Sequence, residues 1–251
     1  MIDRISPTLP PDQQVVMYQN WHHLGFFHWE VPVAELQALL PAGLTVDVFE
    51  GKAYVGLVPF TITGVRPILL PPIPGVSSFH EVNVRTYVHQ QGAHPGVWFF
   101  SLDASSRLAV EAARAAYSLP YFHSEMDFSV AKDFMPEVGM NARRDDERGV
   151  LPATARLRYR PVEGPIIHAA PGTIEHFLCE RYILYAEDTD RELWRARVHH
   201  QPYELRKAEA IELEETLIWS AKIRRPSSAP IRHYAGEVNV KVYGPERVAG
   251  S

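Results

Sequence analysis

Cysteine is nearly absent from the chain, which has only Cys179 among its 251 residues. No disulfide can form within it, which is typical of proteins from a reducing compartment. The first residues, MIDRISPTLPPDQQ, lack the apolar run of a secretory signal peptide. No segment approaches the roughly 18 unbroken apolar residues of a membrane span. We therefore expect a soluble, cytoplasmic protein that makes no membrane contact.

Positive charge is also limited. The formal net charge is -5 at pH 7, whereas a nucleic-acid-binding surface needs a concentrated basic face, so the sequence argues against a nucleic-acid partner. Lysine is particularly scarce, and arginine supplies most of the 25 basic residues. Few positions can therefore provide an amine nucleophile. The lysines are Lys52, Lys132, Lys207, Lys222 and Lys241.

No metal-binding motif is present, although the chain has 12 histidines. The HExxH pattern does not occur, and the adjacent histidines at 22–23 and 199–200 would point to opposite faces of strands. A distant assembly such as His28, Glu81 and His123 is the remaining alternative for a metal site. We expect neither a metal nor another cofactor.

The central stretch, residues 79–122, carries the most informative pattern. It is typical of a strand (FHEVNVRTYV), a turn (QQGAHPG), a second strand (VWFFSLD), a helix and a sharp exit at LP. Alternation places one row of side chains on the same face of the first strand: Phe79, Glu81, Asn83, Arg85 and Tyr87. This row either faces water, as charged strand residues usually do, or lines a pocket.

The remaining pattern predicts short strands joined mainly by hairpins. Strands are predicted at residues 21–31, 44–49, 53–62, 153–160, 181–187, 192–200 and 236–243, and helices at 33–40, 105–117 and 174–180. Residues 44–62 are expected to form a hairpin, and residues 208–223 fit either a strand or a helix. The predicted fold class is α+β, mainly antiparallel β, with a curved sheet or open β-barrel and a few short helices. With 46% hydrophobic residues, the chain can form a single domain over residues 20–251, after a flexible lead at 1–19.

Residues 67–74, PILLPPIP, are predicted to form a loop because proline cannot donate to a β-ladder. The loop is unusually apolar for a surface connection. We favour packing over the core, with a lid or a subunit contact as the alternatives.

Several segments resemble the acetoacetate decarboxylase-like superfamily: HWEVPVAELQALLP at 28–41, GKAYVGLVP at 51–59, EVNVRTYV at 81–88, SLD at 101–103 and ERY at 180–182. From Asn20 to its end, the chain is similar to an uncharacterised bacterial family of this superfamily, domain of unknown function 2071. The resemblance implies a cone-like β-barrel that encloses a small, largely apolar pocket for a small-molecule ligand. It also implies assembly into a homo-oligomer.

The chain departs from the decarboxylase that it resembles, which uses a Schiff-base lysine directly after a proline. Pro120 matches that proline, but Tyr121 and Phe122 occupy the following positions. Glu81 matches the glutamate of the decarboxylase, whereas Glu30 occupies the position of its arginine. Tyrosine and phenylalanine cannot form an imine with a β-keto acid. We therefore expect the fold to be inherited without acetoacetate decarboxylase activity.

The candidate catalytic residues are Glu81 and Tyr121. If a pocket encloses Glu81, desolvation would raise its pKa and allow the carboxyl group to act as a general acid or base. Tyr121 could polarise a substrate carbonyl through its hydroxyl group, although packing as an ordinary core tyrosine is slightly favoured by the pattern alone.

The candidate substrate-binding residues are Arg85, Asn83, Glu30 and His28. Arg85 lies roughly 13 Å along the strand from Glu81, too far for a direct ion pair. It could bind a substrate carboxylate or pair with a neighbouring strand. Asn83 lies between the two and could orient either group. Glu30 and His28 belong to the first segment that matches the superfamily.

Three functions are compatible with these observations. The first is a small-molecule pocket protein, with lyase-like chemistry on a small organic acid or carbonyl compound and no Schiff-base lysine. The alternative is a non-catalytic ligand-binding or structural protein on the same fold. A metal-dependent hydrolase is the third and least supported.

Overall fold

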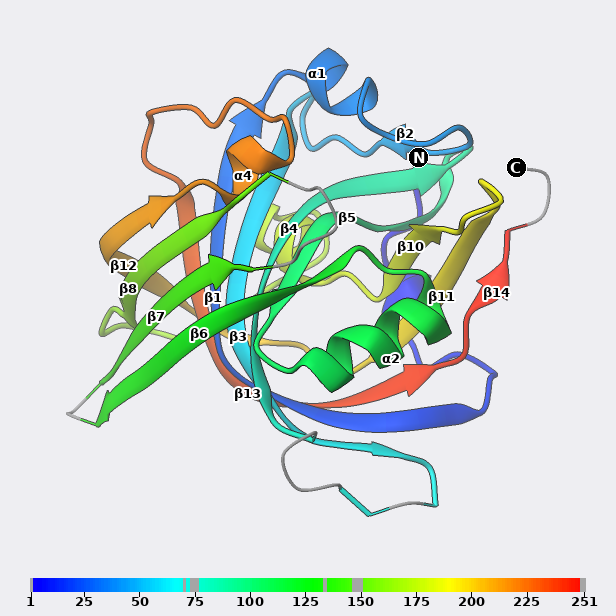
Figure 1. The fold of residues 1–251 in the computed structure, drawn as a ribbon. Coiled ribbons are helices and arrows are strands. Elements are labelled where there is room, and N and C mark those ends of the chain that lie inside the picture. Colours follow the sequence, from blue (N-terminus) through cyan, green and yellow to red (C-terminus); the bar gives the residue numbers. More distant parts are fainter. Residues whose placement is uncertain (1, 70, 73–76, 133–134, 146–150, 249–251) are drawn as a thin grey trace.

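The computed structural model describes residues 2–69, 71–72, 77–132, 135–145 and 151–248. Most of this part of the chain forms a 14-stranded sheet (Figure 1), and the four α-helices found in it are short. The strands are β1 (Val15–Val31), β2 (Thr45–Val46), β3 (Ala53–Pro67), β4 (Phe79–Gln90), β5 (Ala93–Ala104), β6 (Tyr121–Lys132), β7 (Pro136–Arg144), β8 (Thr154–Pro161), β9 (Ile167–His168), β10 (Ile183–Glu187), β11 (Leu193–His199), β12 (Glu204–Glu215), β13 (Ile231–Tyr243) and β14 (Glu246–Arg247). The helices are α1 (Val33–Gln37), α2 (Arg107–Tyr117), α3 (Ile174–Cys179) and α4 (Leu217–Ser220), preceded by the 3-10 turn η1 (Ser6–Thr8). The predicted class, α+β with mainly antiparallel strands, is confirmed.

The strand pairings form a closed ring. They run from β4 through β5, β6, β7, β8, β12, β13, β1 and β3 and return to β4. Among the described strands, β5 alone makes parallel pairs, with β10 at residues 97–98 and with β6 at residues 102–104. The strands β10 and β11 give a second connection between β5 and β13.

Two hydrophobic clusters pack on opposite faces of the long strand β1. Phe26 and Phe27 are adjacent and both buried, but they point in opposite directions because side chains alternate along a strand. Phe27 packs in one cluster with Trp29 and Tyr159. Phe26 belongs to the other, which also contains Tyr87. The second cluster surrounds the candidate site.

Helix α2 has a defined cap at each of its ends. The side chain of Ser106 caps its N-terminus by accepting a hydrogen bond from the Ala109 N–H. At its C-terminus, Ser118 adopts a left-handed conformation (φ 52°) that ends the helix. Val110 is the buried residue of the helix, which lies across the lower front of the view in Figure 1 beside β6.

Several predicted elements differ from those observed. β1 begins at Val15, so residues 15–19, predicted to lie in the lead, pair with β13. The predicted hairpin at 44–62 is wrong, because β2 pairs with β4, and β3 is joined to the preceding segment only by the isolated Phe49–Lys52 bridge. The ambiguous segment contains the end of β12 and then α4.

Two further elements bear on the predictions. The hairpin of β6 and β7 has no counterpart among the predicted elements. The strand β3 extends to Pro67, and part of the predicted loop at 67–74 lies outside the described residues. None of the helices in the described chain is both long and apolar enough to cross a membrane.

Candidate active site

A cavity of about 340 Å³ lies on the side of the sheet where Phe26 packs. Its wall is mostly apolar and comes from β1, β3, β4, β5, α2 and the segments around β10 and β13. Few polar side chains reach it. They include Glu81, Asn83 and Arg85 from β4, Tyr121 at the start of β6, and Arg181 and Tyr203. Four residues of the row predicted on the first strand of the central stretch, Phe79, Glu81, Asn83 and Arg85, therefore line a pocket, whereas Tyr87 is buried outside its lining.

Glu81 is the buried carboxyl group of this cavity, with 2% of its surface exposed. It accepts a hydrogen bond from the Tyr121 hydroxyl group at 2.8 Å and another from the Asn83 side-chain amide at 3.2 Å. Burial raises the pKa of Glu81 to about 7, although the bonds from Tyr121 and Asn83 act in the opposite direction. Both protonation states of Glu81 are therefore accessible near neutral pH.

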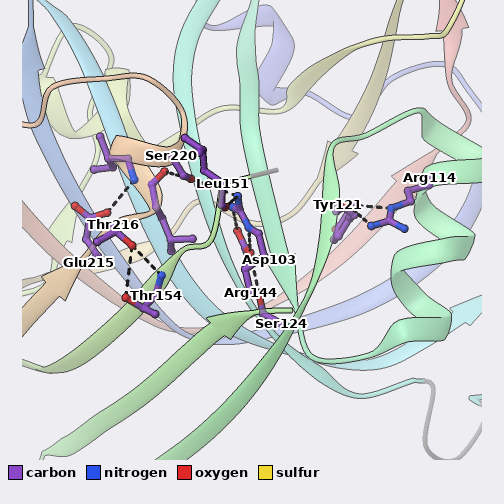
Figure 2. A network of polar contacts seen from close by, with 12 residues as sticks. Asp103, Arg114, Tyr121, Ser124, Arg144, Leu151, Thr154, Glu215, Thr216 and Ser220 are labelled. Carbon is purple, nitrogen blue, oxygen red and sulfur yellow. Dashed lines mark hydrogen bonds and ion pairs between the residues drawn. The ribbon is translucent and has the colours of Figure 1, made fainter. Parts of the chain in front are cut away.

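Tyr121 stands where the resemblance places the missing lysine. Its backbone carbonyl accepts hydrogen bonds from Arg114 Nε at 2.9 Å and Arg114 Nη2 at 2.7 Å, on the right of Figure 2. Burial and the neighbouring Glu81 raise the pKa of Tyr121 well above its usual value, so the hydroxyl group stays protonated and acts as a donor. Helix α2 thus positions the residue that donates to Glu81.

A buried ion pair lies beside the site, between the strands β5 and β7. Arg144 donates to both carboxylate oxygens of Asp103, through Nε and Nη2, at 2.7 Å each, and Ser124 Oγ adds a hydrogen bond at 2.8 Å (Figure 2). Phe122 packs on the Arg144 guanidinium, 4.2 Å from its Cζ to the ring centroid, and is not among the described residues that line the cavity. The second aromatic residue after Pro120 is therefore structural.

Arg85 is half-buried, and no carboxylate in the described chain neutralises its positive charge by direct contact. Its Nη2 atom donates to the Leu178 carbonyl at 3.0 Å, and its guanidinium lies over the rings of Phe26 and Tyr87. Its Nε atom has no hydrogen-bond partner among the described residues. Such a group favours an anionic ligand.

Arg181 is a second guanidinium of the cavity wall, which the sequence reasoning missed. Its Nη1 atom donates to Asp47 at 2.9 Å and its Nε atom to the Phe177 carbonyl at 2.6 Å, while Nη2 has no partner in the described chain. Asp47 also accepts from Arg4, so two arginines share one carboxylate. The only signal was the ERY segment at 180–182, because the pair joins residues far apart in the chain.

The remaining predicted binding residues lie elsewhere. His28 is fully buried behind the cavity, where its Nε2 atom contacts the Tyr87 hydroxyl group at 2.6 Å. Burial, assisted by the charge of Arg85, lowers the pKa of His28 well below its usual value. Glu30 is exposed and pairs with Lys52 at 2.8 Å. It shares a face of β1 with His28, but it lies beyond the core at the end of the strand and is not among the described residues that line this cavity.

The structure also bears on two other possibilities, a metal site that includes His123 and a lysine in the cavity. His123 contacts Asp145 at 2.5 Å, and His28 contacts Tyr87. In the part of the chain that is described, no group of three or more His, Cys, Asp or Glu side chains could hold a metal ion. The described lining of the cavity contains no lysine.

This architecture is that of the acetoacetate decarboxylase-like fold. The structure is similar to an acetoacetate decarboxylase-like enzyme from Sphingomonas wittichii RW1, with a TM-score of 0.62 and 13% identity over 94% of each chain. It is also similar to the enduracididine biosynthesis enzyme MppR, with a TM-score of 0.59 and 12% identity over 97% of this chain and 92% of that one.

At the sequence level, the model of the DUF2071 family, described as an uncharacterized conserved protein, matches residues 18–239. The chain belongs to this family. It is also 38% identical over 230 residues to the uncharacterized protein YqjF of Bacillus subtilis (strain 168), covering 92% of this chain and 91% of the relative.

Proposed function

We propose that the protein is an enzyme that binds an organic acid with a carbonyl group and acts on it by lyase-type acid–base chemistry without an imine. The observation that carries this proposal is the Glu81–Tyr121 pair inside the cavity, with the Glu81 pKa raised to about 7. A general acid or base works best when its pKa lies near the operating pH.

The step that this pair supports is proton removal from the carbon beside the carbonyl group. The C–H bond breaks, its electron pair forms the enolate C=C bond, and the carbonyl π pair moves to oxygen. The proton goes to the Glu81 carboxylate. The Tyr121 hydroxyl group, whose single proton points to Glu81 in the structure, turns to donate to the developing oxyanion instead. This step is common to hydration-type and aldol-type reactions and requires no amine.

Arg85 supports the second part of the proposal, which is an acidic substrate. Its guanidinium packs against aromatic rings and donates a hydrogen bond to the Leu178 carbonyl. A carboxylate would pair with this charge and give the unpartnered Nε atom an acceptor. The structure of MppR with the condensation product of pyruvate and imidazole 4-carboxaldehyde gives an example of this fold with a ligand derived from an oxo acid.

Exchange of the protons beside the carbonyl group in D2O, followed by NMR, tests the chemistry. With oxo acids of increasing length, we expect the wild type to catalyse exchange and Glu81→Gln to be slower by about 100-fold or more. Arg158→Met, which changes an exposed arginine paired with Glu137, serves as the control and should behave as the wild type. Equal exchange in Glu81→Gln and the wild type would remove Glu81 from the mechanism.

Binding to Arg85 is tested separately by calorimetric titration. Arg85→Met should weaken the binding of oxo acids at least about tenfold, because hydrogen bonds to charged groups contribute about 1.5–3 kcal/mol. Binding that depends on Arg85, without any catalysed exchange, would favour the non-catalytic ligand-binding alternative.

A further inference from the structure

The size of the cavity is informative about its ligand. Its volume of about 340 Å³ is roughly twice that of a 150 Å³ apolar protein cavity that binds benzene. An acid of four carbons would leave much of the apolar wall in contact with water. A ligand with an apolar part would bury that wall.

The two polar regions of the cavity are well separated. Glu81, Asn83 and Tyr121 form one region, and Arg85 lies four residues from Glu81 on β4, roughly 13 Å along the strand. The Arg85 guanidinium packs against Tyr87, which is farther still from Glu81 along β4. A carboxylate bound at Arg85 therefore lies at a distance from a carbonyl group bound at Glu81.

Charge distinguishes the two regions. Arg85 and Arg181 both lie over the Tyr87 ring, at 5.7 and 5.1 Å from its centroid, and each has a buried nitrogen without a partner in the described chain. The region around Glu81 has instead a carboxyl group and a hydroxyl group. An anionic group is thus favoured beside Arg85 and Arg181, which line the cavity, and a neutral carbonyl group at Glu81.

Apolar side chains surround the space between these regions. Asn83 is the middle residue of the polar row on β4, and its neighbours across the sheet are Val58 on β3 and Leu102 on β5. All three line the cavity, and Val58 and Leu102 are almost fully buried. This middle section suits methylene groups or a ring.

Building on the proposed function, we infer that the substrate is a medium-length oxo acid that spans the cavity, with its carboxylate at Arg85 and Arg181 and its carbonyl group at Glu81 and Tyr121. Allowing for a hydrogen bond at each end, the two groups would be separated by about 7–13 Å, or about six to eleven bonds at about 1.2 Å per bond. In such a molecule the carboxylate is remote from the carbonyl group and is retained in the reaction. The carbon beside the carbonyl group is the reacting position.

The test compares acetoacetate, 5-oxohexanoate and 7-oxooctanoate by calorimetric titration of the full chain. Each buried methylene should improve the affinity about threefold to fourfold, so 7-oxooctanoate should bind at least about 50-fold more tightly than acetoacetate. Octanoate and 2-octanone, which lack the carbonyl and the carboxylate respectively, serve as ligand controls. Each should bind at least about tenfold more weakly than 7-oxooctanoate.

Two variants assign the ends of the ligand. Arg85→Met should weaken 7-oxooctanoate but leave 2-octanone unchanged, and Tyr121→Phe should weaken 7-oxooctanoate but leave octanoate unchanged. If acetoacetate binds as tightly as 7-oxooctanoate, and still requires Arg85, the spanning substrate is refuted while the proposed function stands. If none of the acids binds in an Arg85-dependent manner, both are refuted.

Discussion

At the scale of single residues, the protonation of Glu81 links the candidate site to stability. Its pKa is about 7 in the folded chain, whereas the ordinary glutamate pKa of 4.5 applies to the unfolded chain. Between these two pH values, the folded protein holds a proton that the unfolded chain has lost. Stability therefore falls as the pH rises through this window. We predict that the free energy of unfolding of the wild type, relative to Glu81→Gln, decreases by about 3 kcal/mol between pH 4.5 and pH 8. Urea unfolding at several pH values measures it, and a constant difference would contradict the prediction.

The aromatic residues after Pro120 lead to a second prediction at this scale. Wild-type protein incubated with acetoacetate and borohydride should show no covalent adduct by intact mass, because no lysine lies among the described residues of the cavity wall. Tyr121→Lys, which introduces an amine beside Glu81, is the matched variant in which trapping is expected. An adduct on the wild-type chain would overturn the imine-free mechanism.

The Asp103–Arg144 pair gives a third prediction. Arg144→Met should destabilise the fold by about 3–5 kcal/mol, because it leaves the buried Asp103 carboxylate without its partner. Arg143→Met is the control from the adjacent position, where an exposed ion pair with Glu125 should contribute less than about 1 kcal/mol. Equal effects of the two substitutions in urea unfolding would contradict this. The double variant Asp103→Asn with Arg144→Met should recover part of the loss.

How far the site could be predicted depends on whether its contacts are local. Strand alternation and the superfamily resemblance were enough to identify Glu81, Asn83 and Arg85 as one row, and to place Tyr121 at the position of the missing lysine. The Arg181–Asp47 pair joins residues separated by 134 positions, so no local pattern could reveal it. Alternation gives the face of a strand but not where the core ends, so it could not show that Glu30 lies outside the lining of the cavity.

At the scale of elements, the close parallel contact between β5 and β10 requires glycine at position 96. A Cβ atom at Gly96 would lie 2.6 Å from the Ile183 carbonyl oxygen, so the two strands could not approach as they do. We predict that Gly96→Ala destabilises the protein by about 1–3 kcal/mol, the usual cost of overpacking. Thermal or urea unfolding measures it.

Gly236→Ala is the matched control for this prediction. A Cβ atom there meets nothing within 4 Å, so its effect should stay within about 0.5 kcal/mol. If the two alanine variants are equally stable, the close approach of β5 and β10 is not required for the fold.

Elements with a strong local signal were predicted well, and those defined by distant partners were not. Helix α3 starts after Thr173 as expected, because that side chain caps the helix by accepting from the His176 N–H. The strands predicted at 181–187 and 192–200 correspond to β10 and β11, which pair as consecutive antiparallel strands. The strand β2 was assigned the wrong partner because hairpin formation is the local default, whereas Asp47 just after it is held by Arg4 and Arg181.

At the scale of the whole molecule, the closed ring predicts cooperative unfolding. No strand of the ring can unfold without breaking its pairing with two neighbouring strands. We also propose that residues 20–251 form one domain. Far-UV circular dichroism and tryptophan fluorescence should therefore give coincident urea transitions. Two separated transitions would instead indicate two independently folding parts. The predicted homo-oligomer and cytoplasmic location stay predictions.

The divided pairing of β5 has a consequence for how this architecture accommodates ligands. One half of the strand is bonded to β10 and the other half to β6, and Leu102, Leu119, Tyr121 and Leu184 pack where these neighbours diverge. Substitutions in β6 or β10 near this point can change the shape of the cavity without changing the pairing of the other strands in the ring. We therefore expect substitutions at this junction to change which ligand the proposed site accepts while the scaffold is retained.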